Sequence, residues 1–410
     1  MTDTDPQREK KKAILRNQVL DGNGKRMDPE VGRFFRENRR YLAMAAGMAA
    51  ALVVLIFVCI RIYHSFRTYT TYQVKWSISL GNSSAQPVVF GGGVAVVGRD
   101  GVDCYDKNGE HLWSAPYEMK QPTAVTEGEY LLIYDKKGQS MVICGAQGQT
   151  GSAATAYPIS RADISAGGVT AAVLENTTES YIAYYRSSGE KLEIEIKSPL
   201  ATNGYPRAIS ISPNGQQLAV SYTTIGGTKS YSRVCFYDFE KGKELPDRIV
   251  GEFSYDDTET YIPELLFPNE KQAIGIGTNF LAFYSAADRT AVTENRFPAG
   301  VQEIRQVFSD GETLAIVGRV ENSEKLMIDL YKMDGDWIAS LDQDQEWPNY
   351  CFNGDCIMMY SEHAVQMISK HGRERLNLNF ENEIGSLAPD GDGETCYLTT
   401  MGELQKIVFR

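Results

Sequence analysis

The sequence is poor in the residues on which most catalytic centres depend. Its 410 residues include four histidines and seven cysteines, but no Gly-x-Ser-x-Gly turn and no pair of adjacent cysteines. Zinc sites need Cys or His pairs at short spacings, and nucleophile-elbow hydrolases need that glycine–serine turn. The histidines are His64, His111, His363 and His371. We therefore expect no catalytic residue, no metal site and no cofactor, and no enzyme.

Cysteine is also too scarce for a scaffold held together by disulfides. Cys104, Cys144 and Cys235 fall within strand-like runs, where a buried thiol behaves as a small hydrophobic side chain. Cys351 and Cys356 flank the turn Phe-Asn-Gly-Asp. These two could face each other across a hairpin and form a bridge in an oxidising exterior. The alternative is that both are free thiols in the core.

Positive charge is in deficit over most of the chain. The net charge is −12, yet residues 1–40 hold eleven Lys/Arg against seven Asp/Glu, a net of +4. The remaining residues therefore carry −12 − 4 = −16. Nucleic acid needs a basic surface, so this distribution argues against a nucleic-acid partner.

Long apolar runs are absent except at residues 41–60, which contain no charged residue and are flanked by arginines. About 20 apolar residues suffice for a helix to cross a bilayer. We predict a transmembrane helix at residues 41–63, followed by a linker at residues 64–72. A cleaved signal peptide would need a small-x-small site, which the end of the run does not offer. The Lys/Arg-rich flank stays inside, so residues 1–40 form a cytoplasmic basic tail at the plasma membrane and the rest lies outside.

Two secondary features accompany the predicted helix. Ala43, Gly47 and Ala51 recur every four residues and would share one face, which would let two helices approach closely in a homodimer. The tail at residues 1–40 either contacts anionic lipid head groups or serves as a docking peptide for a cytoplasmic partner. Membrane lipid is thus one expected partner.

Beyond Tyr72 the pattern is entirely that of short strands. Runs of aliphatic, β-branched and aromatic residues alternate with Gly, Asn and Asp turns, and the units recur about every 40–45 residues. Four short strands per unit at this period predict an all-β fold, a β-propeller of four-stranded antiparallel blades. Blades are expected to begin near the following residues: Gln86, Pro122, Arg161, Pro206, Tyr261, Val301, Pro348 and Ile384. Eight blades are predicted, with seven as the alternative if the weak unit at 122–158 is not a blade.

The last repeat has only three strands before the chain ends. Residues 73–80 can supply the missing outer strand and close the ring, so that residues 73–410 form one propeller without an open sheet edge. Trp76 in this strand matches Trp113 and Trp337, which we assign to the same position of other outer strands.

Two stretches carry a resemblance to known families. Residues 106–113 (Asp-Lys-Asn-Gly-Glu-His-Leu-Trp) resemble the outer hairpin of PQQ-like propellers, and residues 212–219 resemble the hairpin of WD40-like and TolB-like propellers. The whole chain is similar to a family of membrane-tethered propellers from Gram-positive bacteria to which no activity is assigned. Quinoprotein dehydrogenases of this architecture hold their cofactor against two adjacent cysteines and a calcium ion. Because no two cysteines adjoin here, the resemblance does not imply that enzyme.

Three classes of function remain. The first is an extracytoplasmic scaffold that binds a protein or a component of the cell envelope. The second is a transmembrane sensor that signals through the basic tail. The third and most remote is a carboxylate-dependent glycan hydrolase or lyase, which would need carboxylates with raised pKa values converging in the channel. The acidic run at residues 390–394 suggests a calcium loop, but it occupies the position of ordinary hairpin turns, and we interpret it as a turn.

Overall fold

The computed structural model describes two separate units. The described residues are Met44, 47–57, 67–81, 85–226, 229–256, 261–301, 303–320 and 325–410. Residues 1–67 form the first unit and residues 68–410 form the second. Each unit is described by itself below.

The first unit contributes a short helix to the described part of the chain. Residues 47–57 are helical and exposed, and no helix among the described residues is both long and apolar enough to cross a membrane. Most of the remaining predicted span at 41–63, including Ala43, lies outside the described residues. Gly47 and Ala51 lie in the helical stretch, and a Cβ added at Gly47 would contact nothing within 4 Å.

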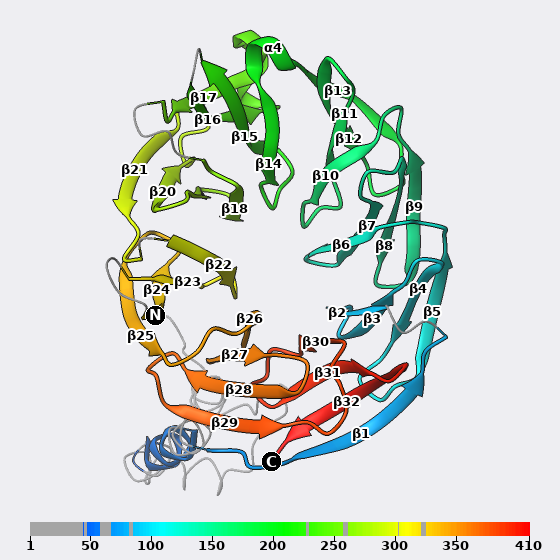
Figure 1. The fold of residues 1–410 in the computed structure, drawn as a ribbon, viewed down its shortest axis with the longest axis vertical. Helices are drawn as coiled ribbons and strands as arrows, with labels where there is room; N and C mark the ends of the chain where they lie inside the picture. Colours follow the sequence, from blue (N-terminus) through cyan, green and yellow to red (C-terminus); the bar gives the residue numbers. More distant parts are fainter. Residues whose placement is uncertain are drawn as a thin grey trace, which may run out of the picture. The chain divides into compact units, whose positions relative to one another are not determined.

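The second unit is a ring of eight antiparallel sheets, each with four strands (Figure 1). From the axis outwards, blade 1 contains β2 (Gln86–Phe90), β3 (Gly93–Val97), β4 (Gly101–Tyr105) and β5 (His111–Pro116). Blade 2 contains β6 (Pro122–Glu127), β7 (Tyr130–Asp135), β8 (Ser140–Gly145) and β9 (Gly148–Ala154). Blade 3 contains β10 (Ile159–Ile164), β11 (Thr170–Glu175), β12 (Glu179–Tyr185) and β13 (Lys191–Pro199). Blade 4 contains β14 (Tyr205–Ile211), β15 (Gln217–Gly226), β16 (Lys229–Asp238) and β17 (Ile249–Ser254).

The other four blades continue the same order. Blade 5 contains β18 (Glu264–Asn269), β19 (Gln272–Ile276), β20 (Phe280–Ser285) and β21 (Thr293–Pro298). Blade 6 contains β22 (Glu303–Ser309), β23 (Thr313–Arg319), β24 (Leu326–Lys332) and β25 (Trp337–Gln343). Blade 7 contains β26 (Asn349–Asn353), β27 (Cys356–Tyr360), β28 (Ala364–Ser369) and β29 (Glu374–Asn379). Blade 8 contains β30 (Ser386–Pro389), β31 (Thr395–Thr400), β32 (Glu403–Phe409) and, outermost, β1 (Tyr72–Ser79).

Within the described part of the propeller, short helices occur only before and in blade 4. These are α4 (Leu200–Asn203), η1 (Lys241–Glu244) and η2 (Pro246–Arg248). The prediction of an all-β, eight-bladed propeller is confirmed, and each innermost strand begins within three residues of its predicted start. The weak unit at 122–158 is a complete blade, so the seven-bladed alternative is wrong.

Closure of the ring joins the start of the propeller to the end of the chain. β1 pairs antiparallel with β32, from Tyr72 opposite Phe409 to Ser79 opposite Glu403. The contact begins before the strand, because the N–H of Tyr69 donates to the carbonyl of Arg375 in blade 7 at 2.7 Å. Blade 8 thus contains strands from both ends of the propeller, and its outer edge is paired.

Two of the three outer-strand tryptophans dock on the next blade. Trp76 donates from Nε1 to the carbonyl of Lys107 at 3.0 Å and covers Gly109, whose φ of +85° suits a residue without Cβ. Trp113 donates in the same way to the carbonyl of Ala146 at 3.2 Å. These bonds attach each outer strand to the turn of the following blade.

Trp337 does not occupy that position, and our assignment of it was wrong. It pairs with Tyr331, just as His111 pairs with Tyr105, and its ring is 63% exposed. Blade 6 has one residue between its turn glycine and the tryptophan, whereas blade 1 has three. Trp337 therefore lies two residues earlier along its outer strand, at the position of His111.

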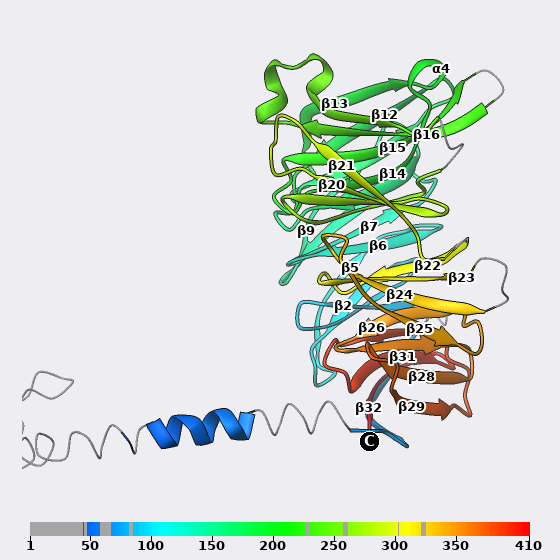
Figure 2. The same cartoon turned by 90° about the vertical axis from the view of Figure 1, so that its left-hand side faces the viewer.

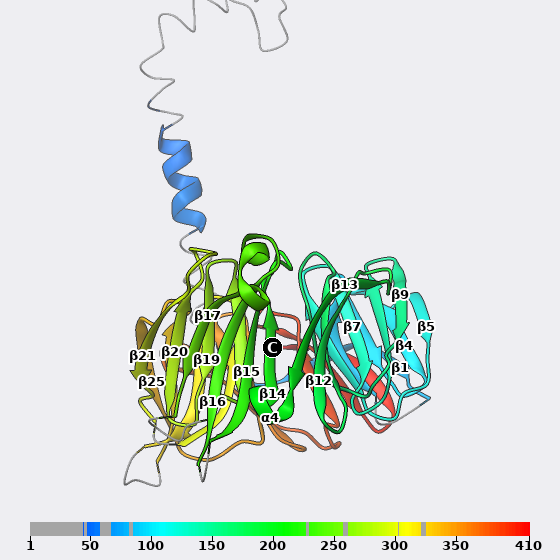
Figure 3. The same ribbon diagram turned by 90° about the horizontal axis from the view of Figure 1, so that it is seen from above.

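The core of the propeller lies between the blades rather than at the axis. Eight hydrophobic clusters each join two neighbouring sheets. The second strand of a blade is therefore largely buried, and in several blades it is almost continuously apolar, as in β3 (Gly-Val-Ala-Val-Val). Figures 2 and 3 show the sheets standing face to face around the ring. The innermost strands contribute some residues to these clusters, such as Ile164 and Phe352, and place others next to the axis.

Of the two alternatives for Cys351 and Cys356, the structure has the free thiols and no disulfide bridge. Cys351 lies opposite Met358, while Cys356 lies opposite Asn353. The two cysteines are therefore diagonal neighbours on one face rather than a directly opposed pair, and diagonal positions are about 7–8 Å apart. That separation is too long for a disulfide without backbone movement. Burial raises the pKa of Cys351 to about 12, so its thiol stays protonated.

Candidate functional site

The innermost strands divide the axis into a polar side and an apolar side. Among the eight strands next to the axis, charged residues occur only in blades 2 to 6 of the described chain. They are Glu127, Arg161, Asp163, Arg207, Glu264, Glu303 and Arg305. We call this group the axial charged set. Blades 7, 8 and 1 are consecutive and place only uncharged residues here.

Backbone bulges follow almost the same division. An extra residue interrupts the pairing of the innermost strand in blades 3, 4, 5 and 6, but not in blades 1, 2, 7 and 8. The unpaired residue is Arg207 in β14 and Arg305 in β22. Bulges re-aim side chains and are common beside functional sites. The charge pattern and the backbone geometry are independent observations that mark the same side.

Asp163 holds two innermost strands together. Its carboxylate accepts the N–H of Ile164 and the N–H of Ile211, each at 2.9 Å, and the second bond crosses from blade 3 to blade 4. Burial raises the pKa of Asp163 to about 6, an effect that these two N–H groups oppose and the charge of Glu127 reinforces. Burial also raises the pKa of Glu127. Because both oxygens of Asp163 are engaged by the backbone, this carboxylate has a structural role.

Arg161, Arg207 and Glu264 are the more available members of the set, since Arg305 pairs with Glu303 at 3.2 Å. Arg161 and Arg207 are exposed on adjacent innermost strands, and neither has an ion pair among the described residues. The guanidinium of Arg207 lies 5.8 Å from the ring centre of the exposed Tyr205. Desolvation by the surrounding ring raises the pKa of Glu264, and the charge of Arg161 partly offsets it. Available charges of both signs beside an aromatic ring can recognise a polar partner.

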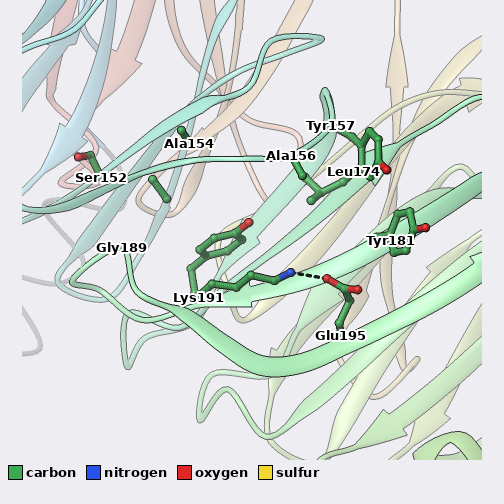
Figure 4. Close-up of a pocket in the computed structure, with 11 residues that line it drawn as sticks. Ser152, Ala154, Ala156, Tyr157, Leu174, Tyr181, Gly189, Lys191 and Glu195 are labelled. Carbon is green, nitrogen blue, oxygen red and sulfur yellow. Dashed lines mark hydrogen bonds and ion pairs between the residues drawn. The ribbon is translucent and has the colours of Figure 1, made fainter.

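A groove on the rim offers a different surface (Figure 4). It lies between blades 2 and 3, has a volume of about 630 Å³, and is lined on one side by Ser152 and on the other by Lys191 and Glu195, which form an ion pair. Tyr157 and Tyr181 stack with ring centres 5.5 Å apart and an interplanar angle of 9°. The charges of this groove are already paired, so its free chemistry is that of tyrosine rings and hydroxyls.

Gly189 closes one end of this groove. It has a φ of +82°, and a Cβ there would lie 2.1 Å from the carbonyl oxygen of Ser152. The turn of blade 3 therefore rests directly on the backbone of β9. In blade 1 the position equivalent to Gly151 holds Trp113. With glycine instead of tryptophan at this position, the backbone of β9 in blade 2 lies in direct contact with the turn of blade 3.

A serine, a histidine and an aspartate meet in blade 1. His111 Nε2 lies 2.8 Å from Ser114 Oγ and 3.4 Å from Asp103 Oδ1, and Ser114 donates to Asp103 at 2.5 Å. In a catalytic triad the carboxylate holds one ring nitrogen while the other takes the serine proton. Here one nitrogen faces both groups, and the serine proton goes to the aspartate. This arrangement does not activate the serine.

Blade 6 repeats the same contacts without a histidine. Ser340 donates to Asp329 at 2.5 Å, and Trp337 Nε1 donates to Ser340 at 3.3 Å. A trio made of an aspartate, a serine and a side chain with a ring nitrogen therefore links the third and fourth strands in both blade 1 and blade 6. The acidic run in blade 8 is likewise engaged locally, because Asp392 accepts the N–H groups of Glu394 and Thr395.

These features define the class of the protein as an eight-bladed β-propeller with a polar axial side. Residues 65–409 match the family of unknown function DUF5711, and the chain belongs to that family. BamB from Moraxella catarrhalis is similar in structure, with a TM-score of 0.52, 12% identity, and coverage of 83% of this chain and 100% of that chain. The C-terminal WD40 domain of Sif2 has a TM-score of 0.54, 8% identity, and coverage of 83% and 99%. The sequence matches none of the curated proteins.

At these identities the two structures show the fold alone. The resemblance to WD40-like propellers is thereby confirmed at the level of architecture, while the PQQ-like and TolB-like resemblances stay predictions. The membrane tether and the Gram-positive source that the resemblance implied stay predictions, as does the absence of enzymatic activity.

Proposed function

We propose that this protein is a single-pass, membrane-anchored scaffold whose propeller lies outside the plasma membrane and binds a protein or an envelope component. The observation that carries this proposal is the axial charged set, which is confined to five consecutive blades. Charged side chains that stay solvated in the free protein can pair on binding, and complementary charge mainly sets specificity and association rate. A scaffold needs such a one-sided recognition surface on a rigid ring.

The anchoring part of the proposal is supported by the sequence. Residues 41–60 form an uncharged run of membrane-spanning length, and residues 47–57 within it are helical and exposed. Alkaline carbonate extraction of cell membranes tests this point: an anchored protein stays in the pellet, whereas a peripheral protein is released. Release of the full-length protein would remove the anchor from the proposal.

The binding part is tested by crosslinking in cells that express the intact, membrane-anchored protein, followed by identification of the crosslinked molecules. We expect a small set of envelope proteins or glycans, and we expect Arg207→Glu to reduce their recovery. Arg186→Glu is the matched control, because Arg186 is an exposed arginine on the rim that pairs with Glu190. Equal loss in both variants, or no loss in either, would contradict recognition at the axis.

A variant lacking residues 1–40 separates the scaffold from the sensor. Partners recovered with both proteins support a scaffold outside the membrane. Partners that require residues 1–40 support signalling through the basic tail. Recovery of neither, together with cleavage of envelope polysaccharide by the purified protein, would replace both with the carboxylate-dependent enzyme.

A further inference from the structure

The axial charged set is divided along the axis as well as around it. Each blade has four antiparallel strands, so each outermost strand ends on the face of the ring where the next innermost strand begins. We call this face the strand-start face. Glu127 is the last residue of β6 and Asp163 is the fifth of six in β10, so both lie near the opposite face. The other five charges lie near the strand-start face, within the first three residues of their strands: Arg161, Arg207, Glu264, Glu303 and Arg305.

The strand-start face lies opposite the point where the chain enters the propeller. β1 runs antiparallel to β32, so Ser79, at the end of β1, lies on the strand-start face and Tyr72 lies on the opposite face. α4, which leads from β13 into β14, also lies on the strand-start face (Figure 3). The segment that precedes β1 therefore joins the propeller on the face away from these five charges.

Arg161 and Arg207 occupy equivalent positions on neighbouring innermost strands. Each is the third residue of its strand and directly precedes a buried alanine. Arg207 is the bulged residue of β14, and the bulge of β10 lies directly before Arg161. Both arginines are exposed and have no ion pair among the described residues, whereas Arg305 pairs with Glu303. The strand-start face thus presents two unpaired guanidinium groups from adjacent blades, and guanidinium groups bind carboxylates through paired hydrogen bonds.

A pocket lies on the same face, directly beside Arg207. It lies between blades 3 and 4 and has a volume of about 380 Å³, within the usual range for small-ligand sites. Tyr205 lines it and connects it to Arg207, because the centre of its ring lies 5.8 Å from the guanidinium carbon. The other walls combine threonine hydroxyls, such as that of Thr178, with the apolar side chains of Leu200 and Ala201. None of the described residues that line this pocket is charged, so it suits an apolar side chain next to a carboxylate.

We propose that the strand-start face binds an acidic peptide segment of a partner protein, with carboxylates on Arg161 and Arg207 and a neighbouring apolar side chain in this pocket. This inference rests on the proposed function and gives its protein partner a chemical class. The chain beyond residue 40 carries a large net negative charge, so it repels an acidic segment over most of its surface, whereas the unpaired arginines attract one. An anionic polysaccharide also offers carboxylates, but it brings no apolar side chain for the pocket.

Calorimetry with the full-length protein tests the proposal. The probe is a blocked hexapeptide of alternating glutamate and leucine. Its comparison peptides have glutamine in place of glutamate, lysine in place of glutamate, or alanine in place of leucine. We expect the glutamine and lysine peptides not to bind and the alanine peptide to bind more weakly than the probe. Arg207→Gln should weaken binding of the probe at least about tenfold, as expected for the loss of a hydrogen bond between charged groups, and rising salt should lower the affinity.

Arg186→Gln is the matched control, because Arg186 is an exposed arginine that pairs with Glu190 in the hairpin between β12 and β13. This hairpin lies on the opposite face, so the variant should leave the peptide affinity unchanged. The double variant Arg161→Glu, Arg207→Glu should lose the glutamate peptide and bind the lysine peptide instead. Because this second test requires a gain of binding, misfolding of the variant cannot imitate the expected result.

Ala201→Trp tests the pocket separately. Ala201 is exposed, so the indole ring fills the pocket without disturbing the core. The variant should bind the leucine and alanine forms of the acidic peptide equally, whereas the natural protein should prefer the leucine form. An unchanged preference for leucine in the variant would overturn the placement of the apolar side chain.

The outcomes separate this inference from the proposed function. No binding of the glutamate peptide at millimolar concentration, or equal weakening by Arg186→Gln and Arg207→Gln, would overturn the acidic-peptide site. Equal affinity for a hyaluronan hexamer, an anionic saccharide, would overturn the assignment to a peptide. If crosslinking in cells still recovers partners through Arg207 in these cases, the scaffold stands and recognises a different chemistry. If the peptide binds as expected but crosslinking recovers no partner, the peptide site stands and the scaffold function falls.

Discussion

The two sides of the propeller axis are built for different tasks. Blades 3 to 6 have bulged innermost strands, and with blade 2 they hold all seven axial charges. Blades 7, 8 and 1 have regular innermost strands that place Phe90, Tyr350, Phe352 and Leu387 in buried positions. The same four-stranded repeat thus yields two axial surfaces, although innermost strands on both sides also contribute residues to the core between the blades, such as Phe352 and Leu265.

The apolar side is also where the ring closes. Asn353 of blade 7 and Lys107 of blade 1 both reach the acidic turn of blade 8, the first through Gly391 and Gly393 and the second through Asp390. The junction between β1 and β32 has no hairpin connection, so strand pairing and side-chain contacts alone hold it. We infer that stability is concentrated at the closure and recognition on the side that needs no closure. The following predictions test this division.

The largest effect is expected for Asn353→Ala on the closing side. Asn353 is fully buried; its Oδ1 accepts the N–H groups of Gly391 and Gly393 at 3.2 and 3.0 Å, and its Nδ2 donates to the carbonyl of Thr395 at 3.4 Å. Its removal leaves several polar groups without partners, so the free energy of unfolding should fall by about 2–4 kcal/mol in chemical denaturation.

Asn108→Ala provides the comparison, because Asn108 sits in an exposed hairpin turn and contacts only Asp106 in its own turn. Its cost should stay under about 1 kcal/mol. Similar losses in the two variants would contradict a special role of the closure.

The second effect concerns pH and belongs to the polar side. Burial raises the pKa of Asp163 from 3.8 to about 6. Between these values the folded chain binds more protons than the unfolded chain, so stability falls as the pH rises through that window. We expect the free energy of unfolding to be lower at pH 7 than at pH 4 by about 1–3 kcal/mol through this group.

Asp163→Asn should flatten this dependence. The amide stays neutral, so the stability of the variant should not fall between pH 4 and pH 7 through this group. Its nitrogen cannot accept the second backbone N–H group, so the variant should be less stable than the natural protein at pH 4. Glu127 and Glu264 have pKa shifts in the same direction and will leave a smaller residual slope. An unchanged pH profile in the variant would show that Asp163 is ionised in the folded protein at little cost.

The architecture could be predicted from sequence because its signals are local. Glycines at hairpin turns, such as Gly109 and Gly372, adopt positive φ values and mark each repeat independently of the rest of the chain. The alternation of apolar runs between them then fixes four strands per blade. This is why all eight innermost strands began close to their expected positions.

The axial charged set could not be predicted in the same way. A bulge reverses the inward–outward alternation beyond it, so the direction of Arg207 or Arg305 depends on pairing that the strand itself does not reveal. A signal was nevertheless available, since aligning residues 205–211 with residues 303–309 places these two arginines in the same position. The groove between blades 2 and 3 had no such signal, because its residues come from separate segments.

A third, smaller effect is expected at Arg207, an exposed member of the axial charged set. Arg207→Ala should change the free energy of unfolding by less than about 0.5 kcal/mol, because the side chain is exposed and has no ion pair among the described residues. Thermal and chemical unfolding measure this change. A loss of 2 kcal/mol or more would place Arg207 in the packing of the ring and weaken its assignment to recognition.

The smallest effect is expected at the histidine, serine and aspartate of blade 1. Because Trp337, Ser340 and Asp329 are linked in a similar way in blade 6, we expect the trio to tie two outer strands together rather than to activate the serine. His111→Ala removes exposed contacts with Ser114 and Asp103 and should change stability by less than about 0.5 kcal/mol. Activity-based probes with a fluorophosphonate group should leave both the natural protein and Ser114→Ala unlabelled. Labelling that disappears in Ser114→Ala would reverse this reading, since only an activated serine attacks such a probe.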